Sequence, residues 1–192
     1  MNDSISNRFN GLVLAGGRSS RMGQDKAQLT LPGRISLLEH ARQQLLSAGA
    51  GEVYLNHSSV SGAQKLVEPF PDRGPLSGIH AALCNNSHLP LLILPVDMPL
   101  MTPVYLRQLV QHGQHKQHSC YFHEQCLPLF VFQSDQAKQL ISAWLSAGES
   151  PSIWRLLKAL QALPQNIEDA NACKNANNPE QWRECLKSLG AN

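Results

Sequence analysis

The strongest constraint on the fold is a nearly continuous apolar run at residues 89–96, which ends at Asp97. A strand with apolar residues on both sides must be covered on both faces, which is typical of a central strand in a parallel sheet. Shorter apolar segments predict four further strands, at residues 11–14, 53–55, 65–67 and 129–132. The chain is therefore expected to form an α/β fold around one sheet.

Stretches with apolar residues at helical spacing lie between these strands. The first runs through Leu37, Ala41 and Leu45, and another helix is predicted at residues 78–83. A capping residue followed by proline is favoured at helix starts, and three such pairs occur, at Thr102-Pro103, Ser150-Pro151 and Asn178-Pro179. Strands alternating with helices imply right-handed crossovers, so we predict three layers: a mostly parallel, Rossmann-like sheet with helices on both faces.

Length, charge and cysteine usage narrow the class of protein. The 192 residues suit one domain with a single core, and a formal net charge of +2 gives no argument for a nucleic-acid surface. No apolar run approaches the roughly 20 residues that cross a bilayer, and residues 1–10 lack the apolar segment of a secretory signal. Five cysteines without a C-x-x-C pair favour reduced thiols. We expect a cytoplasmic protein that binds neither nucleic acid nor a membrane.

The predicted sheet also predicts where a ligand binds. In open α/β sheets, ligands bind beyond the carboxyl ends of the strands. The glycine-rich loop after the first strand, Asn56 after the second and Asp97 after the central strand all fall at that edge. These are also the segments whose chemistry suits a charged ligand, so position and chemistry agree.

Residues 14–26 read LAGGRSSRMGQDK and follow the first predicted strand directly. Gly16 and Gly17 allow the backbone to approach a ligand with its N–H groups pointing inward. Arg21 and Lys26 add positive charge, since arginine can bind two phosphate oxygens and lysine acts as a mobile point charge. The loop is neither a Walker loop nor a dinucleotide fingerprint. These residues alone leave open a phosphate-binding loop and a solvated surface turn.

Asp97 is the candidate metal ligand. Pro95 and Pro99 flank it at the end of the central strand, which holds its carboxylate in a fixed place. Mg²⁺ prefers one or two such oxygens, with phosphates and water completing its shell. The alternative is an aspartate that caps the following segment.

The complete loop, L-A-G-G-x-S-x-R-M-G-x-D-K, resembles the opening signature of the molybdenum cofactor guanylyltransferases, the MobA family. The resemblance extends over nearly all of the chain, through Gly74-Pro75-Leu76-Ser77-Gly78, Pro95-Val96-Asp97-Met98-Pro99 and Asn175-Ala176-Asn177-Asn178-Pro179-Glu180. It implies the nucleotidyltransferase fold and a reaction in which GMP is transferred from GTP to molybdopterin and pyrophosphate is released.

The resemblance also implies roles for particular residues. Arg21, Lys26 and Asp97 are the expected catalytic residues, with Asp97 binding Mg²⁺ and with Mn²⁺ as the alternative cation. The residues expected to contact the nucleotide or the acceptor are Leu14, Ala15, Gly16, Gly17, Arg21, Lys26, Asn56, Asp72, Gly74, Gly78, Asn175 and Asn177. For Asn175 and Asn177, the alternative from the residues alone is turn formation or capping.

One segment departs from the family pattern. The family places a nucleotide-contacting aspartate several residues before G-P-L, where this chain has Glu68 or Pro69. Asp72, two residues before Gly74, is our candidate for that role. Two alternatives therefore stay open beside GMP transfer: a related nucleotidyltransferase that uses CTP or another NTP, and a non-catalytic carrier of nucleotide or molybdopterin.

We expect a single nucleotidyltransferase domain over residues 1–192, with a nucleotide-binding half at 1–110 and an acceptor-binding half at 111–192. The expected partners are GTP, molybdopterin and proteins of molybdenum-cofactor assembly. Imidazole and thiol groups that could bind a transition metal gather between residues 112 and 126. A polar helix end or loop rich in Gln and His is the interpretation we favour there.

Overall fold

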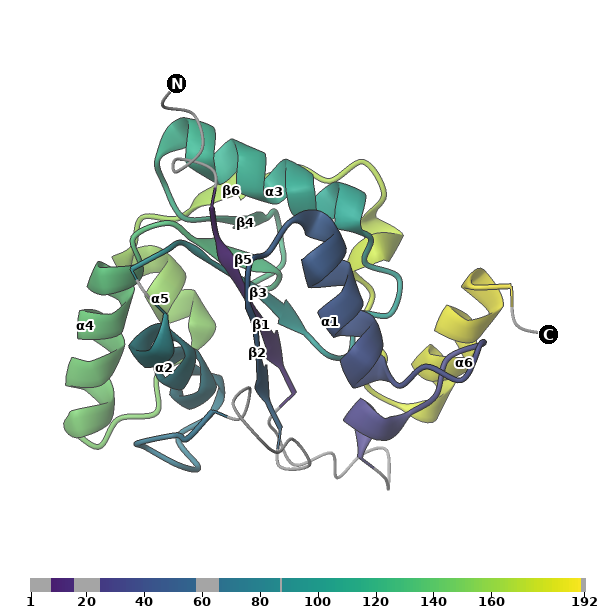
Figure 1. The fold of residues 1–192 in the computed structure, drawn as a ribbon, viewed down its shortest axis with the longest axis horizontal. Helices are drawn as coiled ribbons and strands as arrows, with labels where there is room; N and C mark the ends of the chain where they lie inside the picture. Colours follow the sequence, from purple (N-terminus) through teal and green to yellow (C-terminus); the bar gives the residue numbers. More distant parts are fainter. Residues whose placement is uncertain (1–7, 16–24, 58–65, 87, 191–192) are drawn as a thin grey trace.

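The computed structural model describes residues 8–15, 25–57, 66–86 and 88–190 (Figure 1). Within these segments the chain forms a six-stranded sheet in the order β2-β1-β3-β5-β4-β6. The strands are β1 (Asn10–Leu14), β2 (Val53–Asn56), β3 (Leu91–Pro95), β4 (Cys120–Phe122), β5 (Leu129–Val131) and β6 (Leu163–Gln165). Among these strands, β5 runs opposite to its neighbours and the others share one direction. The predicted mostly parallel sheet is confirmed.

Helices cover both faces of the sheet. Figure 1 shows α1 and α3 on one side, and α2, α4 and α5 on the other. The helices are α1 (Leu37–Ala48), α2 (Pro75–Asn85), α3 (Pro103–Lys116), α4 (Ser134–Ser146), α5 (Ile153–Ala159) and α6 (Pro179–Ser188), with 3-10 turns η1 (Lys26–Gln28) and η2 (Ala170–Cys173). The three-layer arrangement predicted from the sequence is confirmed. None of these described helices is long and apolar enough to cross a membrane.

The core lies around β1 and β3, whose residues are all buried. Leu91, Leu92 and Ile93 are 0% exposed because layers of helices cover both faces of β3. Helix α2 is buried along most of its length, since small residues such as Ala81 and Ala82 let it pack closely. The continuous apolar run at residues 89–96 thus marks the central strand, as predicted.

The prediction of a strand at residues 65–67 is wrong for its described part. Leu66 and Val67 belong to no strand, and Val67 is 78% exposed. Leu66 is buried, but its neighbour Val67 is not, so the two residues show no strand-like burial over a longer segment. Pro69, just downstream, lacks the N–H that a paired strand uses. In contrast, β4 and β6 were not predicted. Strand β4 follows a segment rich in Gln and His, and β6 has the sequence Leu-Pro-Gln, in which a proline takes the central position.

The predicted start of α5 needs a correction of two residues. Ser152, not Ser150, is the N-cap, and its hydroxyl accepts a hydrogen bond from the backbone N–H of Arg155 at 3.2 Å. Pro151 therefore precedes the cap and lies outside the helix. The other two helix starts are confirmed, with Pro103 and Pro179 in the first turn of α3 and α6.

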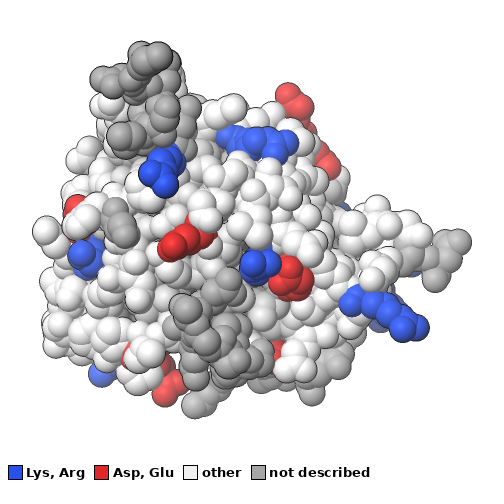
Figure 2. All heavy atoms as spheres, viewed as in Figure 1, with Lys and Arg blue, Asp and Glu red and all other residues white. Residues whose placement is uncertain are grey.

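Charges of both signs are interspersed on the face of the molecule in Figure 2. The Lys and Arg side chains drawn there are separated by uncharged surface and by Asp and Glu. Among the described residues visible on this face, Lys and Arg form no continuous basic stripe of the kind that follows a nucleic-acid backbone.

We expect Gly113→Ala to destabilise the fold, because Gly113 of α3 packs against side chains of β5 and β4. A Cβ there would stand 2.4 Å from Cδ1 of Phe130 and 2.9 Å from Sγ of Cys120. Overpacking of this kind costs about 1–3 kcal/mol, more than the gain in helix propensity of up to about 1 kcal/mol. Urea denaturation measures the loss. Gln111→Ala, at an exposed position of the same helix, is the control, and equal stability of the two variants would contradict this packing.

Candidate functional site

Three neighbouring strands end in register. Leu14, the last residue of β1, pairs with Asn56 at the end of β2 and with Pro95 at the end of β3. The N–H of Val96 then donates to the carbonyl of Leu14 at 3.1 Å, which extends the pairing by one residue. Because the three strands are parallel, the segments that follow them leave the sheet at one edge. The prediction that the first loop, Asn56 and Asp97 share this edge is confirmed for Asn56, for Asp97 and for the point where the loop begins, at Leu14 and Ala15.

The antiparallel strand β5 brings further residues to the same edge. Its first residue, Leu129, pairs with Ile93 of β3, so the segment before β5 lies beside the carboxyl end of β3. Gln125, Cys126 and Leu127 occupy this segment and line the pocket described below. Sequence reasoning missed Gln125 and Cys126 because it placed no strand at Cys120–Phe122, and hence no turn between β4 and β5.

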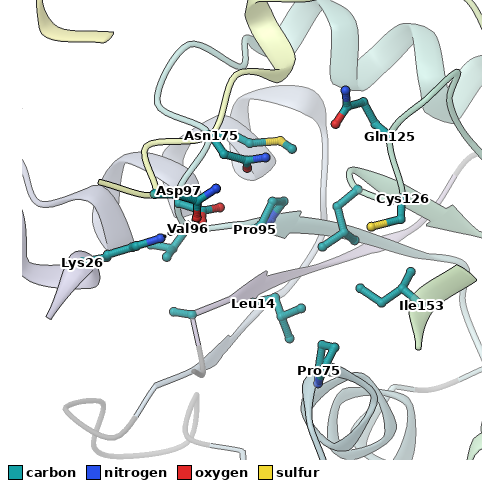
Figure 3. Close-up of a pocket in the computed structure, with 14 residues that line it drawn as sticks. Leu14, Lys26, Pro75, Pro95, Val96, Asp97, Gln125, Cys126, Ile153 and Asn175 are labelled. Atoms are coloured by element: carbon teal, nitrogen blue, oxygen red, sulfur yellow. Dashed lines mark hydrogen bonds and ion pairs between the residues drawn. The ribbon is translucent and has the colours of Figure 1, made fainter. Parts of the chain in front are cut away.

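A pocket of about 370 Å³ opens at this edge (Figure 3). It is lined by Leu14, Ala15, Lys26, Pro75, Pro95, Val96, Asp97, Met98, Gln125, Cys126, Leu127, Ile153, Asn175 and Asn177. In Figure 3, Lys26 reaches toward Asp97, with Asn175 beside it, while Cys126 and Ile153 lie on the opposite side. The pocket therefore has a charged, amide-rich end and a mainly apolar end.

Lys26 joins the parts of the charged end. Its Nζ lies 3.1 Å from Oδ2 of Asp97 and 2.7 Å from Oδ1 of Asn177, residues that are 71 and 151 positions away in the sequence. The side chains of Lys26 and Asp97 are 15% and 20% exposed, so solvent screens this ion pair only in part. A lysine has three N–H donors, and two of them are used in these bonds among the described residues.

The segment around Asn177 is fixed at both of its ends. The N–H of Ala176 donates to the carbonyl of Asp97 at 2.8 Å, which ties the segment to the end of β3. The N–H of Asn177 donates to Oε1 of Gln181 at 2.9 Å, and Asn178 caps α6 by accepting from the N–H of Gln181. The predicted capping role of Asn178 is confirmed. These bonds bring Asn175 and Asn177 to the pocket.

Helix α1 braces the loop that carries Asp97. Nε2 of His40 lies 3.1 Å from the carbonyl oxygen of Pro99. Burial lowers the pKa of His40, and the hydrogen bond with Pro99 opposes that shift only in part. The imidazole is therefore neutral at pH 7 and can donate its Nε2–H to the carbonyl. The position of Asp97 thus depends on a partly buried contact as well as on the strand.

Asn56 lies against α2. It is 8% exposed, and a Cβ added to Gly78 would stand 1.9 Å from its Nδ2 and 3.1 Å from Cδ1 of Leu14. Only a residue without a side chain fits between Asn56 and the helix. Sequence reasoning singled out both residues separately, and the structure places them in contact.

Cys126 contributes a pocket wall rather than a reactive group. Burial raises the pKa of its thiol, while a backbone hydrogen bond lowers it less. The protonated thiol that results is a poor nucleophile. Burial also raises the pKa of Cys120, to about 12, and the five cysteines of the chain are free.

Several predicted residues lie elsewhere or cannot be placed. Gly16, Gly17 and Arg21 fall outside the described residues. Asp72 and Gly74 lie in the exposed turn before α2, at φ angles of 61° and 77°. Neither lines the pocket. The functional roles assigned to these residues remain predictions.

In the described segments, no group of three or more His, Cys, Asp or Glu side chains could hold a metal ion. The histidines and cysteines between residues 112 and 126 thus form no such site. A site of one carboxylate with amide oxygens, as at Asp97, is of a different kind.

Comparisons with known proteins give a consistent result. The model of a family described as the MobA-like NTP transferase domain matches residues 11–166. A molybdenum cofactor guanylyltransferase from Xanthomonas euvesicatoria is 34% identical, covering 95% of this chain and 97% of that protein. A probable molybdenum cofactor guanylyltransferase from Synechococcus elongatus is 30% identical, with 91% and 96% covered.

Two solved structures show the likeness of fold. A nucleotidyl transferase from Methanothermobacter has a TM-score of 0.72 at 18% identity, covering 95% of this chain and 98% of its own. Molybdopterin-guanine dinucleotide biosynthesis protein A from Archaeoglobus fulgidus has a TM-score of 0.67 at 18% identity, with the same coverage of 95% and 98%.

We expect Gly78→Ala to destabilise the chain by displacing the Asn56 amide, at a cost of about 1–3 kcal/mol. Removing that amide should relieve the clash, so the same substitution should cost less than half as much in an Asn56→Ala background. Urea denaturation of the four proteins of this double-mutant cycle measures the difference. An equal cost of Gly78→Ala in both backgrounds would show that Asn56 does not occupy the space over the glycine.

Proposed function

We propose, since this chain belongs to the molybdenum cofactor guanylyltransferases of the MobA-like family, that it transfers GMP from GTP to molybdopterin and releases pyrophosphate. Membership of this family rests on the match over residues 11–166 and on the 34% identity along 95% of the chain. Because of this membership, the chain is a nucleotidyltransferase. The observation that carries the proposal is the contact of Lys26 with both Asp97 and Asn177 at the edge where three strands end.

The charged end of the pocket has donors that suit Mg²⁺. Asp97 offers a carboxylate that is 20% exposed, and Asn175 and Asn177 line the same pocket with amide groups. A hard cation prefers such oxygens, completed by phosphate and water. We propose that Asp97 holds Mg²⁺, with Mn²⁺ as the alternative cation. When bound, the ion would neutralise charge on the nucleotide phosphates.

Lys26 would stabilise the charge that develops as pyrophosphate leaves. In the proposed reaction, a phosphate oxygen of molybdopterin forms a bond to the α-phosphorus of GTP. The bond from that phosphorus to the bridging oxygen breaks, and its electron pair leaves with pyrophosphate. A phosphate oxygen is already anionic and needs no strong base, so catalysis rests on positioning and charge neutralisation. Arg21 is proposed to assist Lys26 in this role.

The apolar end of the pocket would limit hydrolysis. Leu14, Pro75, Leu127 and Ile153 line it, and Leu14, Leu127 and Ile153 are buried. Such walls exclude water, which would otherwise compete with molybdopterin for the α-phosphorus. The glycine-rich loop and Asn56, Asp72, Gly74 and Gly78 would contact GTP, as the family resemblance implies.

The two halves of the chain would divide the work. Residues 1–110 carry β1, β2 and β3 and would hold the nucleotide, while residues 111–192 supply Gln125, Cys126, Ile153, Asn175 and Asn177 and would hold the acceptor. Proteins of molybdenum-cofactor assembly would deliver or receive the pterin. We propose the cytoplasm as the location, where GTP is available and thiols stay reduced.

We expect Lys26→Ala to lower kcat/KM for pyrophosphate release by about 30- to 1000-fold, because a charged donor to the leaving group is lost. This range corresponds to about 2–4 kcal/mol of transition-state stabilisation. Lys158→Ala removes an exposed lysine on α5 and is the matched control. Asp97→Asn keeps the shape of the side chain and should raise the Mg²⁺ concentration needed for half-maximal rate. Full turnover in Lys26→Ala or Asp97→Asn would overturn these roles.

We expect pyrophosphate release to require molybdopterin and to favour GTP over ATP, CTP and UTP by at least about 10-fold, the discrimination that about 1.4 kcal/mol provides. The assay measures pyrophosphate with each of the four nucleotides, with and without molybdopterin, at fixed Mg²⁺. A preference for CTP or UTP would instead indicate a related transferase. Binding of GTP without any pyrophosphate release would indicate a carrier.

A further inference from the structure

We propose that His57 is a positioning residue, which fixes Lys26 in the pocket by holding Asp25. This inference rests on the proposed function, because it assumes that Lys26 acts in catalysis. His57 directly follows β2, and no motif of the sequence singled it out.

The contact between His57 and Asp25 is direct, and its imidazole partner is buried. Nε2 of His57 lies 2.9 Å from Oδ2 of Asp25, and the imidazole is only 7% exposed. The Asp25 side chain is 38% exposed, so the ring is the buried partner of this pair. An Nε2–H donor on the ring can bond the carboxylate, and a hydrogen bond to an ionised acceptor is stronger than one between neutral groups. The ring and the carboxylate come from segments 32 residues apart, so the bond ties the end of β2 to the segment that carries Lys26.

The other oxygen of Asp25 holds the start of η1. Oδ1 accepts a hydrogen bond from the N–H of Ala27 at 3.1 Å, which makes Asp25 the N-cap of this turn. One carboxylate thus binds His57 through one oxygen and the backbone next to Lys26 through the other. Any shift of the carboxylate moves the first residue of η1, which is Lys26 itself.

A turn as short as η1 cannot fix its own orientation. It has three residues, and its backbone bonds run from the N–H groups of Gln28 and Leu29 to the carbonyls of Asp25 and Lys26, each at 3.1 Å. Short 3-10 turns have poor hydrogen-bond geometry and need outside support. Ala27, 1% exposed, anchors one side of the turn in the core. The bond from His57 to Asp25 supplies a second anchor, which sets the rotation of the turn about the first.

That rotation decides where the ammonium of Lys26 lies. Its Nζ must stay within hydrogen-bond distance of Asp97 and Asn177, which it meets at 3.1 and 2.7 Å. Catalysis by charge placement is sensitive to such geometry, and a displacement of about 1 Å can cost about 100-fold in rate. Loss of the bond between His57 and Asp25 should therefore lower kcat more than it changes KM.

The test compares two polar substitutions that differ in reach. His57→Gln keeps an N–H donor near the place of Nε2, whereas His57→Asn has a side chain too short to reach Asp25. We expect His57→Asn to lower kcat about 10- to 100-fold and His57→Gln to restore most of the loss. Gln28→Ala removes an exposed hydrogen bond to the same oxygen of Asp25 at 3.3 Å, and serves as the control with unchanged kcat.

A double-mutant cycle tells whether His57 acts through Lys26. In a Lys26→Ala background, His57→Asn should lower the residual rate by less than about twofold, since the group that it positions is gone. Effects that multiply would overturn the proposal. Equal kcat in wild type, His57→Gln and His57→Asn would also overturn it, as would equal losses in both variants.

A second measurement does not depend on activity. NMR of lysine ammonium groups follows the Lys26 signal, assigned by its absence in Lys26→Arg. His57→Asn should shift this signal toward its position in Asp97→Asn, and His57→Gln should leave it in place. An unchanged signal in His57→Asn would overturn the positioning role. If the wild-type protein releases no pyrophosphate, the proposed function fails, while this measurement still decides whether His57 places Lys26.

Discussion

The parallel pairing of β1 with β2 and β3 is the constraint on which the rest of the site depends. Its register places Leu14 opposite both Asn56 and Pro95, so three chain segments leave the sheet at the same level. A slip of one residue in either pair would turn every buried side chain of that strand to the other face. The apolar side chains of β1 and β3 exclude such a slip. The packing of the core therefore also fixes where, along the strand direction, the segments that carry Ala15, His57 and Asp97 leave the sheet.

The charges at the charged end of the pocket compensate one another. Lys26 and Asp97 form a partly buried ion pair, and Asn177 accepts a further bond from the same ammonium. Taking either charge out of water alone would be costly, so each requires the other. For a nucleotidyltransferase this arrangement is useful, since the groups that would meet a cation and a phosphate are held in place beforehand. Preorganised charges of this kind need not rearrange during the reaction.

How much of the site the sequence predicts depends on how each residue is brought there. Leu14, Asn56 and Asp97 follow strands that the apolar pattern reveals, and the rule for parallel sheets puts them at one edge. Gln125 and Cys126 arrive through the antiparallel pairing of β5, which the apolar pattern reveals, with β4, which the sequence analysis did not predict as a strand. The contact between Lys26 and Asn177 spans 151 residues, and no local pattern encodes such a distance. Asp72, chosen by its nearness to Gly74, lies in an exposed turn outside the pocket.

The end of β2 supports the site on both faces of the sheet. Successive residues of an extended segment point to opposite faces. Asn56 accordingly meets Gly78 on α2, while His57 meets Asp25 beside η1, and α1 lies on the face opposite to α2 (Figure 1). Two adjacent side chains thus contact elements on opposite faces of the sheet, Asn56 at α2 and His57 at the segment that leads into η1. A substitution of one of these two residues would leave the contact of the other in place. The two contacts can therefore be separated by mutation even though both residues lie at the end of β2.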